Sequence, residues 1–407
     1  MEFRQRNEWN KRLIDTMPKG SSTASKAPKY LPEEPEVILR GRGCRVWDDK
    51  AHEFIDFRNA LGPVTLGYCY PEVDQAITAQ LKNGIIFGHP SSIECEVSEK
   101  LCEVIPCAEQ ARFLKTGGEA CAAVIRIARA YTGRGHIIQI GYNGWLNSLA
   151  MGSRVLPNQV SGVQIPGVPS EISELYHAVK WNDIEGIRTL FDMYTNDIAA
   201  VIVAADYGEF EQGKVFYPFL RDITTANDAI LIFDEIVTGF RVALGGVQEY
   251  FGVKPDLCVF AKGIANGMPL SVYAGKREIM QTCEKPGFSI SSTYGGETLS
   301  LAACRAVIKI YKKLDVIGHI RTNGEYLWSK VNEIFNYNNI PIRLKGIPQC
   351  PVFTLTSESD KGVLDRFFRA AYANGVSLYN VSYVNLSHNL TDCDDAIQLI
   401  SQAVKDL

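Results

Sequence analysis

Three apolar segments constrain the fold of this chain more than any other feature of its sequence. They cover residues 198–204, 229–233 and 256–260, and within them Ile, Val, Leu, Phe and Ala follow one another without regular polar alternation. A strand that is apolar on both faces has to be buried on both faces, which is typical of a parallel sheet covered by helices. Because segments with a helical pattern lie between such runs, we expect an α/β domain.

Further elements extend this alternation from about residue 70 onward. We expect helices over residues 71–83, 92–105, 119–132 and 299–314, and strands over residues 111–114, 136–140 and 352–355. Ahead of them, the pattern indicates a short amphipathic helix over residues 1–17, an extended segment over 18–36 and a hairpin over 46–57. We expect a large domain over residues 61–314 and a small α+β domain over 315–407, with the N-terminal segment 1–60 packing on the small one.

Composition and charge narrow the classes of function. The chain of 407 residues has 42 Lys and Arg against 46 Asp and Glu, so its net charge of −4 favours neither nucleic acid nor an anionic membrane as partner. No apolar stretch approaches the ~20 residues of a membrane helix, and the charged N-terminus lacks a signal core. The cysteines occur singly without a C-x-x-C pair, which predicts reduced thiols and a cytoplasmic protein. We expect no metal centre.

An acid and a lysine follow two of the apolar segments. Asp234 comes directly after Ile230-Leu231-Ile232-Phe233, and Lys262 lies in the small-residue turn that follows Phe260. Such a lysine can form a Schiff base with the aldehyde of pyridoxal phosphate, and such an acid can keep the ring nitrogen protonated. By themselves these residues equally fit a solvated turn lysine and an acid that caps a helix or binds a metal.

Two glycine-rich turns and an aromatic residue add to this pattern. Gly117 and Gly118 join a strand to a helix, where backbone N–H groups and the helix dipole attract a phosphate. The turn before residue 299 offers hydroxyls and N–H groups, or is a simple helix start capped by Thr298. Tyr142 follows a strand, where its ring either stacks on a flat cofactor or packs under a loop.

Taken together, these segments resemble the class III aminotransferases, which are pyridoxal phosphate enzymes of fold-type I. The resemblance runs from about residue 18 to residue 397. Within the family, the chain is similar above all to the glutamate-1-semialdehyde aminomutase-like branch. It is carried by LIFDEIVTGFRVALGGVQEYFGVKPDLCVFAKGIANGMPLSVYAGKREIM and SSTYGGETLSLAA, with support from GCRVWDDKAHEFIDF, LGYCYPEV and RIARAYTGR. It implies a large domain with a mainly parallel, seven-stranded type of sheet, a smaller α+β domain, and a homodimer with shared active sites.

The resemblance also implies roles for individual residues. Lys262 is expected to be the Schiff-base lysine that moves protons between substrate and cofactor carbons, and Asp234 to pair with the pyridine nitrogen. Ile236 and Tyr142 are expected to pack on opposite faces of the ring. The cofactor alternates between pyridoxal and pyridoxamine phosphate in this family.

The phosphate of the cofactor is expected to lie at the turn formed by Thr116, Gly117 and Gly118. The family usually has a hydroxyl residue at the position of Gly118, so Thr116 is expected to compensate for its loss here. Thr293 is expected to reach the phosphate of the neighbouring subunit, which is why a homodimer is implied.

Other departures from the family fall where substrate is bound. Asn143 stands where a histidine is common, and Ala204-Ala205 where Glu-Pro is usual, with Asp206 as a candidate substitute. An arginine that holds the substrate carboxylate in the aminomutases corresponds to Lys26, which lacks the bidentate fork of arginine. Lys26 and Asn143 are therefore candidate substrate contacts.

These observations predict an aminotransferase that moves an amino group from an amino-acid donor to a ketone or aldehyde acceptor. A sugar or natural-product pathway is one setting for such an acceptor. The alternative is a 2,1-aminomutase, which exchanges the two groups within a single amino aldehyde. A third hypothesis, a structural or regulatory homologue without cofactor, is disfavoured because Lys262 and Asp234 are both retained.

Overall fold

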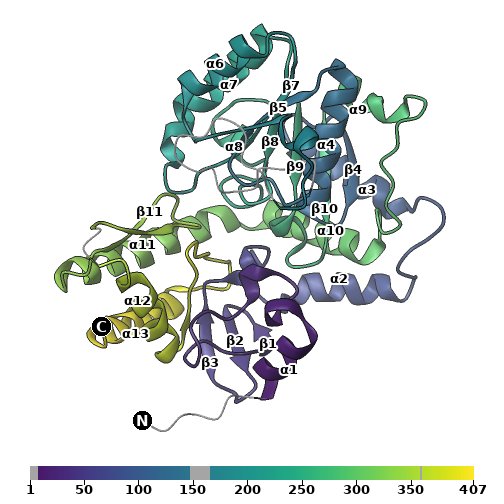
Figure 1. Ribbon diagram of the computed structural model, residues 1–407. Helices are drawn as coiled ribbons and strands as arrows, with labels where there is room; N and C mark the ends of the chain where they lie inside the picture. The colour runs from purple at the N-terminus through teal and green to yellow at the C-terminus, as the bar shows by residue number, and fades with distance from the viewer. Residues whose placement is uncertain (1–7, 147–165, 358–359) are drawn as a thin grey trace. The chain divides into compact units, whose positions relative to one another are not determined.

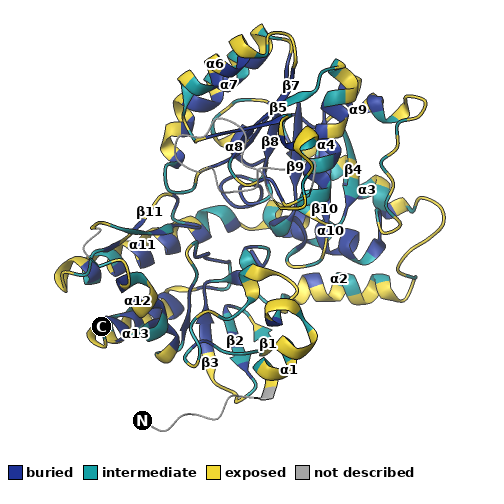
Figure 2. Cartoon of the chain, in the orientation of Figure 1, coloured by how far each residue is buried: buried dark blue, intermediate teal, exposed yellow. Residues whose placement is uncertain are grey.

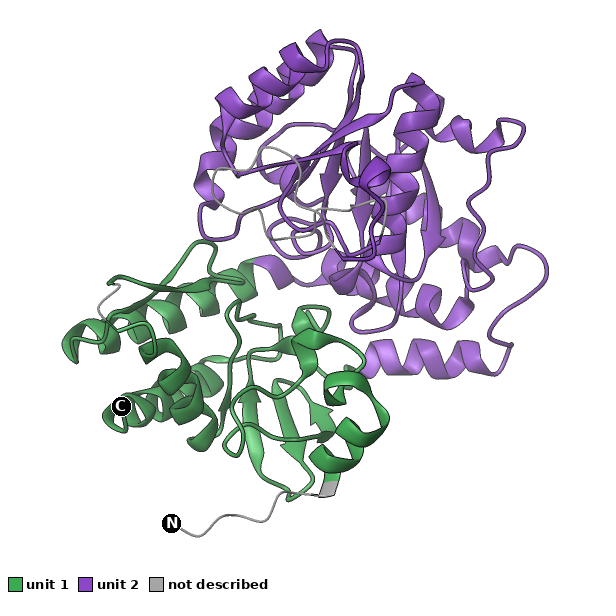
Figure 3. Ribbon diagram, in the orientation of Figure 1, with its two compact units in different colours: residues 1–70, 318–407 green, residues 71–317 purple. Residues whose placement is uncertain are grey.

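The computed structural model describes residues 8–146, 166–357 and 360–407, which form two compact units (Figure 1). One unit contains residues 1–70 and 318–407, and the other contains residues 71–317 (Figure 3). The sequence places these boundaries at 60/61 and 314/315. In both descriptions, the N-terminal segment belongs with the C-terminal part of the chain.

The 71–317 unit is built on a seven-stranded sheet with the order β4-β10-β9-β8-β7-β5-β6. Strand β10 is antiparallel to both of its neighbours, and the other pairs of adjacent strands are parallel. The strands are β4 (Gln110–Leu114), β5 (His136–Ile140), β6 (Tyr176–Val179), β7 (Ile198–Ala204), β8 (Ile230–Asp234), β9 (Leu257–Phe260) and β10 (Ser271–Gly275). The α/β class and the mainly parallel sheet are therefore confirmed, whereas the sequence patterns did not predict β6 and β10.

Helices cover both faces of this sheet, which explains the uniform apolar character of its strands. Ile232 of β8 packs in one core with α4 (Gly117–Thr132), while the next residue, Phe233, meets Tyr217 of α7 (Gly213–Ala226) at a ring-centroid distance of 4.8 Å. Figure 2 shows the strands as buried ribbons between exposed outer helix faces. The other helices of the unit are α2 (Pro71–Leu81), α3 (Ser92–Val104), α5 (Ser170–Ser173), α6 (Ile184–Met193), α8 (Val247–Tyr250), α9 (Arg277–Met280) and α10 (Thr298–Lys313).

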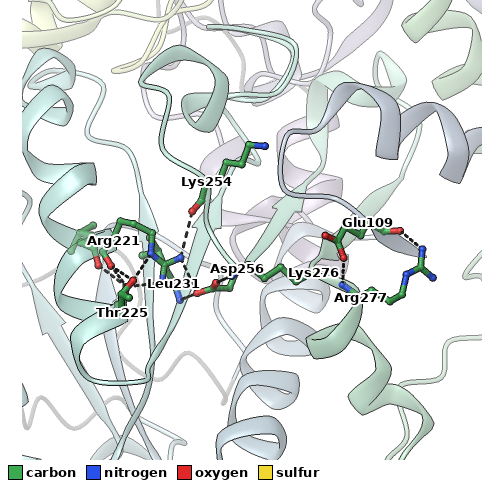
Figure 4. A network of polar contacts seen from close by, with 10 residues as sticks. Glu109, Arg221, Thr225, Leu231, Lys254, Asp256, Lys276 and Arg277 are labelled. Carbon is green, nitrogen blue, oxygen red and sulfur yellow. Dashed lines mark hydrogen bonds and ion pairs between the residues drawn. The ribbon is translucent and has the colours of Figure 1, made fainter.

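A buried carboxylate fastens the amino-terminal end of β9 to its surroundings (Figure 4). Asp256 accepts a hydrogen bond from the Leu231 backbone N–H at 2.8 Å and forms ion pairs with Arg221 at 3.0 Å and Lys276 at 2.7 Å. Burial alone would raise the pKa of Asp256, but the two cations and the N–H hold that pKa below its ordinary value. The network joins α7, β8 and the residue after β10, so it sets where β9 starts.

The other unit joins the two ends of the chain in one sheet. Strands β1 (Ile38–Arg42), β2 (Arg45–Asp48) and β3 (Glu53–Asp56) are antiparallel, and β13 (Val376–Ser377) pairs in parallel with β3. The expected hairpin over 46–57 is present as β2 and β3. The unit also contains β11 (Ile342–Lys345), β12 (Val352–Leu355), α1 (Glu8–Thr16), most of α11 (Val316–Tyr337), α12 (Val363–Ala373) and α13 (Leu390–Lys405).

The N-terminal segment departs from the expected extended form. Residues 18–20 and 24–26 form two short 3-10 turns, so the prediction of a continuously extended segment over 18–36 is wrong. Within the described ranges, no helix has both the length and the apolar character needed to cross a membrane. Nor do the described His, Cys, Asp and Glu side chains form a group of three or more that could hold a metal ion.

His388 is a buried histidine of the 1–70/318–407 unit. Its ring is fully buried, stacks on Phe57 at 4.6 Å, and accepts the backbone N–H of Asn385 through Nδ1 at 3.1 Å. Burial lowers the pKa of His388 to about 3. The folded protein therefore keeps this imidazole neutral at a pH where the unfolded chain protonates it.

We expect this histidine to make the protein acid-sensitive. Because its folded pKa lies below the unfolded value of about 6.5, the unfolded state binds an extra proton below that pH, and stability is lost as pH falls toward 3. The loss amounts to about 2 kcal/mol between pH 6.5 and 5. Thermal unfolding of His388→Gln across this range should show a smaller decrease in Tm than the unchanged protein, whereas substitution of the exposed His89 should leave the decrease as it is. Equal decreases in all three proteins would contradict the assignment.

Candidate active site

The register of the parallel strands brings the predicted site residues to one edge of the sheet. Asp234, the last residue of β8, is paired with Val259 of β9, and Lys262 lies three residues beyond that partner. On its other side Asp234 is paired with Ala204, the last residue of β7. Ligands of open α/β sheets bind at the carboxyl ends of the strands, which is where this edge lies.

The backbone at Lys262 has an uncommon conformation. Lys262 begins a short 3-10 helix (Lys262–Ala265) with a φ of +47°, in the left-handed region that L side chains rarely adopt. The preceding Ala261 is extended, and the next three residues are buried. A left-handed non-glycine residue costs roughly 1 kcal/mol or more, and such strain is concentrated at functional sites. The turn therefore places one half-buried lysine at the sheet edge. The burial of the neighbouring residues offsets the free-energy cost of its backbone conformation.

Asp234 is a buried carboxylate surrounded by donors. Its Oδ1 accepts the Ile236 backbone N–H at 3.0 Å, and its Oδ2 accepts the side-chain amide of Asn143 at 3.0 Å. Burial raises the pKa of Asp234, while these donors and the positive charge of Lys262 act to lower it. The carboxylate is thus placed where a positively charged partner would stabilise it.

The chain after β5 supplies an aromatic ring to the same edge. Gly141 has a φ of +76°, and a Cβ there would lie 2.9 Å from the Ala204 carbonyl oxygen, so the two strand ends approach closely. The Tyr142 ring is 55% exposed, whereas Asn143 is fully buried. The Oδ1 atom of Asn143 has no hydrogen-bond partner among the described residues.

The turn after β4 has the geometry of an anion site. Thr116 caps α4 in a capping box, where its hydroxyl donates to Glu119 Oε2 at 2.9 Å and accepts the Glu119 N–H at 3.4 Å. A Cβ on Gly117 would lie 2.4 Å from Ile236 Cδ1, so Ile236 packs directly on this glycine. A Cβ on Gly118 would meet no close contact, since the nearest atoms, Gly144 Cα and Leu146 Cγ, would lie at an ordinary van der Waals distance of 3.9 Å. The N–H groups of both glycines begin the helix, where a phosphate is attracted.

The second glycine-rich turn is tied to the first. Lys115 forms an ion pair with Glu297 at 2.8 Å, and Glu297 caps α10 by accepting the N–H groups of Leu299 and Ser300. The capping residue is therefore Glu297 and not Thr298, because the carboxylate reaches two N–H groups while the Thr298 hydroxyl donates to the Gly84 carbonyl at 2.9 Å. Thr293 is exposed.

Two candidate positions remain, Asp206 and Lys26. Asp206 is exposed, and its Oδ1 accepts the N–H groups of Gly208 and Glu209 at 2.8 and 3.0 Å, so its carboxylate stabilises its own turn. Lys26 lies in the 1–70/318–407 unit, within the second 3-10 turn.

Two site residues have no counterpart in the sequence prediction. Cys121 of α4 donates to Asp234 Oδ2 at an Sγ–O distance of 3.5 Å. It follows Gly117 by one helical turn, so helical spacing places both on the same face. Glu235 is fully buried and accepts the N–H groups of Val247 and Gln248 at 2.8 and 3.2 Å, and burial raises its pKa to about 7. It anchors the loop that follows Asp234.

These residues fit pyridoxal phosphate. The donors at Gly117 and Gly118 would hold the phosphate, Asp234 would hold the ring nitrogen, and Lys262 would meet the aldehyde. The Oδ1 atom of buried Asn143, which has no partner among the described residues, leaves an acceptor for a bound group. The packing of Ile236 on Gly117 places an apolar side chain at the turn, where it could flank a ring.

Gly117 and Gly118 form a matched pair for testing the anion turn. We expect Gly117→Ala to weaken cofactor binding about tenfold, because the new methyl displaces Ile236 from its place on the turn. Gly118→Ala should bind the cofactor as the unchanged protein does, since its methyl would meet its nearest neighbours at an ordinary van der Waals distance of 3.9 Å. Titration of the apoprotein with pyridoxal phosphate, followed by absorbance, measures both. A larger loss of cofactor affinity in Gly118→Ala than in Gly117→Ala would contradict this account of the turn.

Comparisons with known proteins agree with this geometry. The family model for aminotransferase class-III matches residues 29–407. The glutamate-1-semialdehyde 2,1-aminomutase of Sulfurihydrogenibium azorense is 32% identical over 95% of each chain, and that of Francisella philomiragia is 32% identical over 97% of this chain and 96% of its own.

Solved structures share the fold over almost the whole chain. An omega-transaminase from Sphaerobacter thermophilus has a TM-score of 0.89 at 24% identity and covers 98% of this chain and 96% of its own. A glutamate-1-semialdehyde-aminomutase from Pseudomonas aeruginosa PAO1, in complex with PMP, has a TM-score of 0.81 at 19% identity, over 98% of this chain and 94% of its own. The fold class, the enzymatic nature and the pyridoxal phosphate cofactor expected from the sequence are thereby confirmed. With the family model matching all but the first 28 residues, the chain belongs to the class III aminotransferases.

Proposed function

We propose that this chain catalyses amino transfer of the aminomutase type, in which an amino group and a carbonyl exchange places within one small substrate. The observation that carries the proposal is the meeting of Lys262 and Asp234 at one sheet edge in a chain whose curated relatives are named glutamate-1-semialdehyde 2,1-aminomutase. These names favour the aminomutase over the two-substrate transaminase that the sequence favoured. The aminomutase reaction is therefore the first candidate, and two-substrate transamination is the second.

The residues divide the work according to their positions. When bound, pyridoxal phosphate supplies an aldehyde that takes up an amino group and a ring that withdraws electrons from the substrate carbon. Lys262 would take a proton from that carbon and return it to the cofactor carbon that bears the amino nitrogen, as general base and acid. Asp234 would hold the positive charge at the ring nitrogen. Gly117 and Gly118 would orient the phosphate and keep the reacting atoms within reach of Lys262.

Two-substrate transamination is the second candidate, and the departures from the aminomutase pattern favour it. Lys26 offers a point charge where the aminomutases hold the substrate carboxylate with the fork of an arginine. The carboxylate of Asp206 is engaged by its own turn, so it does not replace the acid that is lost at Ala204. Both differences are compatible with a substrate other than glutamate 1-semialdehyde, including a separate ketone or aldehyde acceptor.

A single-substrate assay separates the two candidates. We expect the holoenzyme to convert glutamate 1-semialdehyde into its isomeric amino ketone without an amino donor, as followed by chromatography with mass detection. Lys262→Ala should reduce turnover by about a thousandfold or more, because the proton carrier is lost. The exposed Lys254→Ala is the matched control and should keep full activity. A requirement for an added amino acid, with release of its keto acid, would identify a two-substrate transaminase.

We also propose a homodimer in which Thr293 of one subunit reaches the phosphate held by the other. The exposed Thr293 and Tyr294 support this, and so do exposed apolar side chains on a neighbouring segment, Ile85 to Phe87. That segment is tied to the start of α10 by the Thr298 N–H, which donates to the Ile85 carbonyl at 2.9 Å. A run of exposed apolar residues is typical of a surface that another chain covers.

The free state of all eleven cysteines supports a cytoplasmic location.

Mixed subunits test the shared site without any substrate. A Lys262→Ala subunit has no lysine to which borohydride reduction could link the cofactor. A Thr293→Glu subunit should repel the phosphate through its added negative charge. Co-refolded subunits of the two variants should regain linkage of the cofactor to Lys262 of the Thr293→Glu chain, because that site then receives Thr293 from its partner. No recovery would mean that Thr293 acts within its own subunit or not at all, and sedimentation of the protein as a monomer would exclude the dimer.

A further inference from the structure

The buried carboxylate of Asp234 has two side-chain donors that the proposed function does not by itself require. Asn143 reaches Asp234 Oδ2 with its Nδ2 at 3.0 Å, and Cys121 reaches the same oxygen with its Sγ at 3.5 Å. The orientation of the Asn143 amide follows from this contact, since the reverse orientation would place two oxygens 3.0 Å apart. Asn143 and Cys121 are each fully buried.

The hydrogen-bonding capacity of the carboxylate limits what else it can hold. An ionised carboxylate has about four acceptor positions, two on each oxygen. Asn143 and Cys121 take both positions of Oδ2, and the Ile236 N–H takes one position of Oδ1 at 3.0 Å. One position of Oδ1 is left among the described residues. A ring nitrogen that donates to Asp234 is thereby directed to Oδ1.

We propose that Asn143 and Cys121 are positioning residues that hold Asp234 through its Oδ2, so that Oδ1 meets the ring nitrogen of the cofactor and keeps it protonated. This inference rests on the proposed function, because it concerns the same cofactor site. It gives Asn143 a role through Asp234, in place of the substrate contact expected from the sequence. It adds Cys121, to which neither the motifs nor the comparisons assign a role.

The electrostatics of the site explain why such donors matter. In a buried pair the proton can lie on the ring nitrogen, giving two charges, or on the carboxylate, giving none, and burial favours the uncharged form. Burial indeed raises the pKa of Asp234, and the hydrogen bonds from Ile236 and Asn143 act against that rise. Burial also raises the pKa of Cys121 well above its ordinary value, so its thiol remains protonated and able to donate. Each donor that makes Asp234 less basic keeps the proton on the ring.

The nearby groups from the other elements do not replace these donors. Tyr217 from α7 is fully buried, and burial together with the charges of Glu235 and Asp234 raises its pKa well above the ordinary value. Lys262 lowers the pKa of Asp234 through its charge, but its charge would change as it takes up and releases protons during the reaction. Asn143 and Cys121 stay in place whatever the state of the lysine.

The test uses the holoenzyme with pyridoxal phosphate labelled with ¹⁵N in its ring. The nitrogen resonance reports whether the ring is protonated, and a titration gives the Kd. We expect Asn143→Ala to raise the Kd about tenfold and Cys121→Ala about threefold, in line with the strengths of an amide and a thiol donor. Both variants should move the resonance toward that of an unprotonated pyridine, and the double variant should move it further.

Two variants serve as controls for packing. Cys121→Ser keeps a donor in nearly the same volume and should restore the resonance. Cys304→Ala removes a buried thiol of α10 whose pKa is raised by burial alone, without a hydrogen bond to Asp234, and should change neither resonance nor Kd. If Cys121→Ala and Asn143→Ala behave like Cys304→Ala, or lose affinity without any change in the nitrogen resonance, the inference is overturned. Failure of the unchanged protein to bind pyridoxal phosphate would instead refute the proposed function.

Discussion

The parallel register of β7, β8 and β9 is the constraint on which the site depends. It places Asp234 beside Ala204 and beside Val259, and through Val259 it sets the distance to Lys262. A slip of one residue would turn every side chain of a strand to the opposite face, moving Phe233 into the place of Asp234. The core prevents this slip because alternate residues of β8 pack against α4 and α7. The chemistry of the edge is therefore a consequence of the packing beneath it.

Buried carboxylates hold this edge in place, each by a different set of partners. Asp256 is held by two cations at the start of β9, whereas Asp234 at the end of β8 is held by neutral donors and one backbone N–H. Glu235 accepts the N–H groups of the first two residues of α8, and a Cβ on Gly246 would lie 2.1 Å from its Oε2. Among the described residues, these three carboxylates therefore differ in what holds them, and Asp234 is the one that ends a strand beside Lys262.

The departures from the family fit the structure at the positions where they occur. A Cβ on Gly118 would lie 3.9 Å from its nearest neighbours, so steric crowding does not explain why the hydroxyl residue is absent there. Asn143 keeps a donor toward Asp234 in the place of a histidine, but it does not titrate near neutral pH as a histidine does. Ala204 lies where the end of β5 approaches β7, with Gly141 against its carbonyl oxygen. These differences concern the ring and the substrate, while the proposed role of Lys262 is unaffected by them.

Much of this protein was readable from the sequence because local signals and burial agreed. The strands over 136–140, 198–204 and 352–355 have the predicted bounds, since uniformly apolar or β-branched runs between helical patterns indicate them directly. Lys262 and Asp234 were recognisable because each follows such a run. The sequence alone thus determined the fold class and the family, and it suggested the role that is proposed for Lys262.

Only the tertiary structure decided which groups meet. Strand β10 (Ser271–Gly275) was not predicted because it is held in place by antiparallel pairing with β9 and with β4, and β4 is distant in sequence. The cap of α10 proved to be Glu297 because its carboxylate is held by Lys115, a residue far along the chain. The contact of Cys121 with Asp234 likewise depends on how α4 lies on the sheet. Sequence patterns record which residues are buried, but the partners of a buried polar group are chosen by packing across the chain.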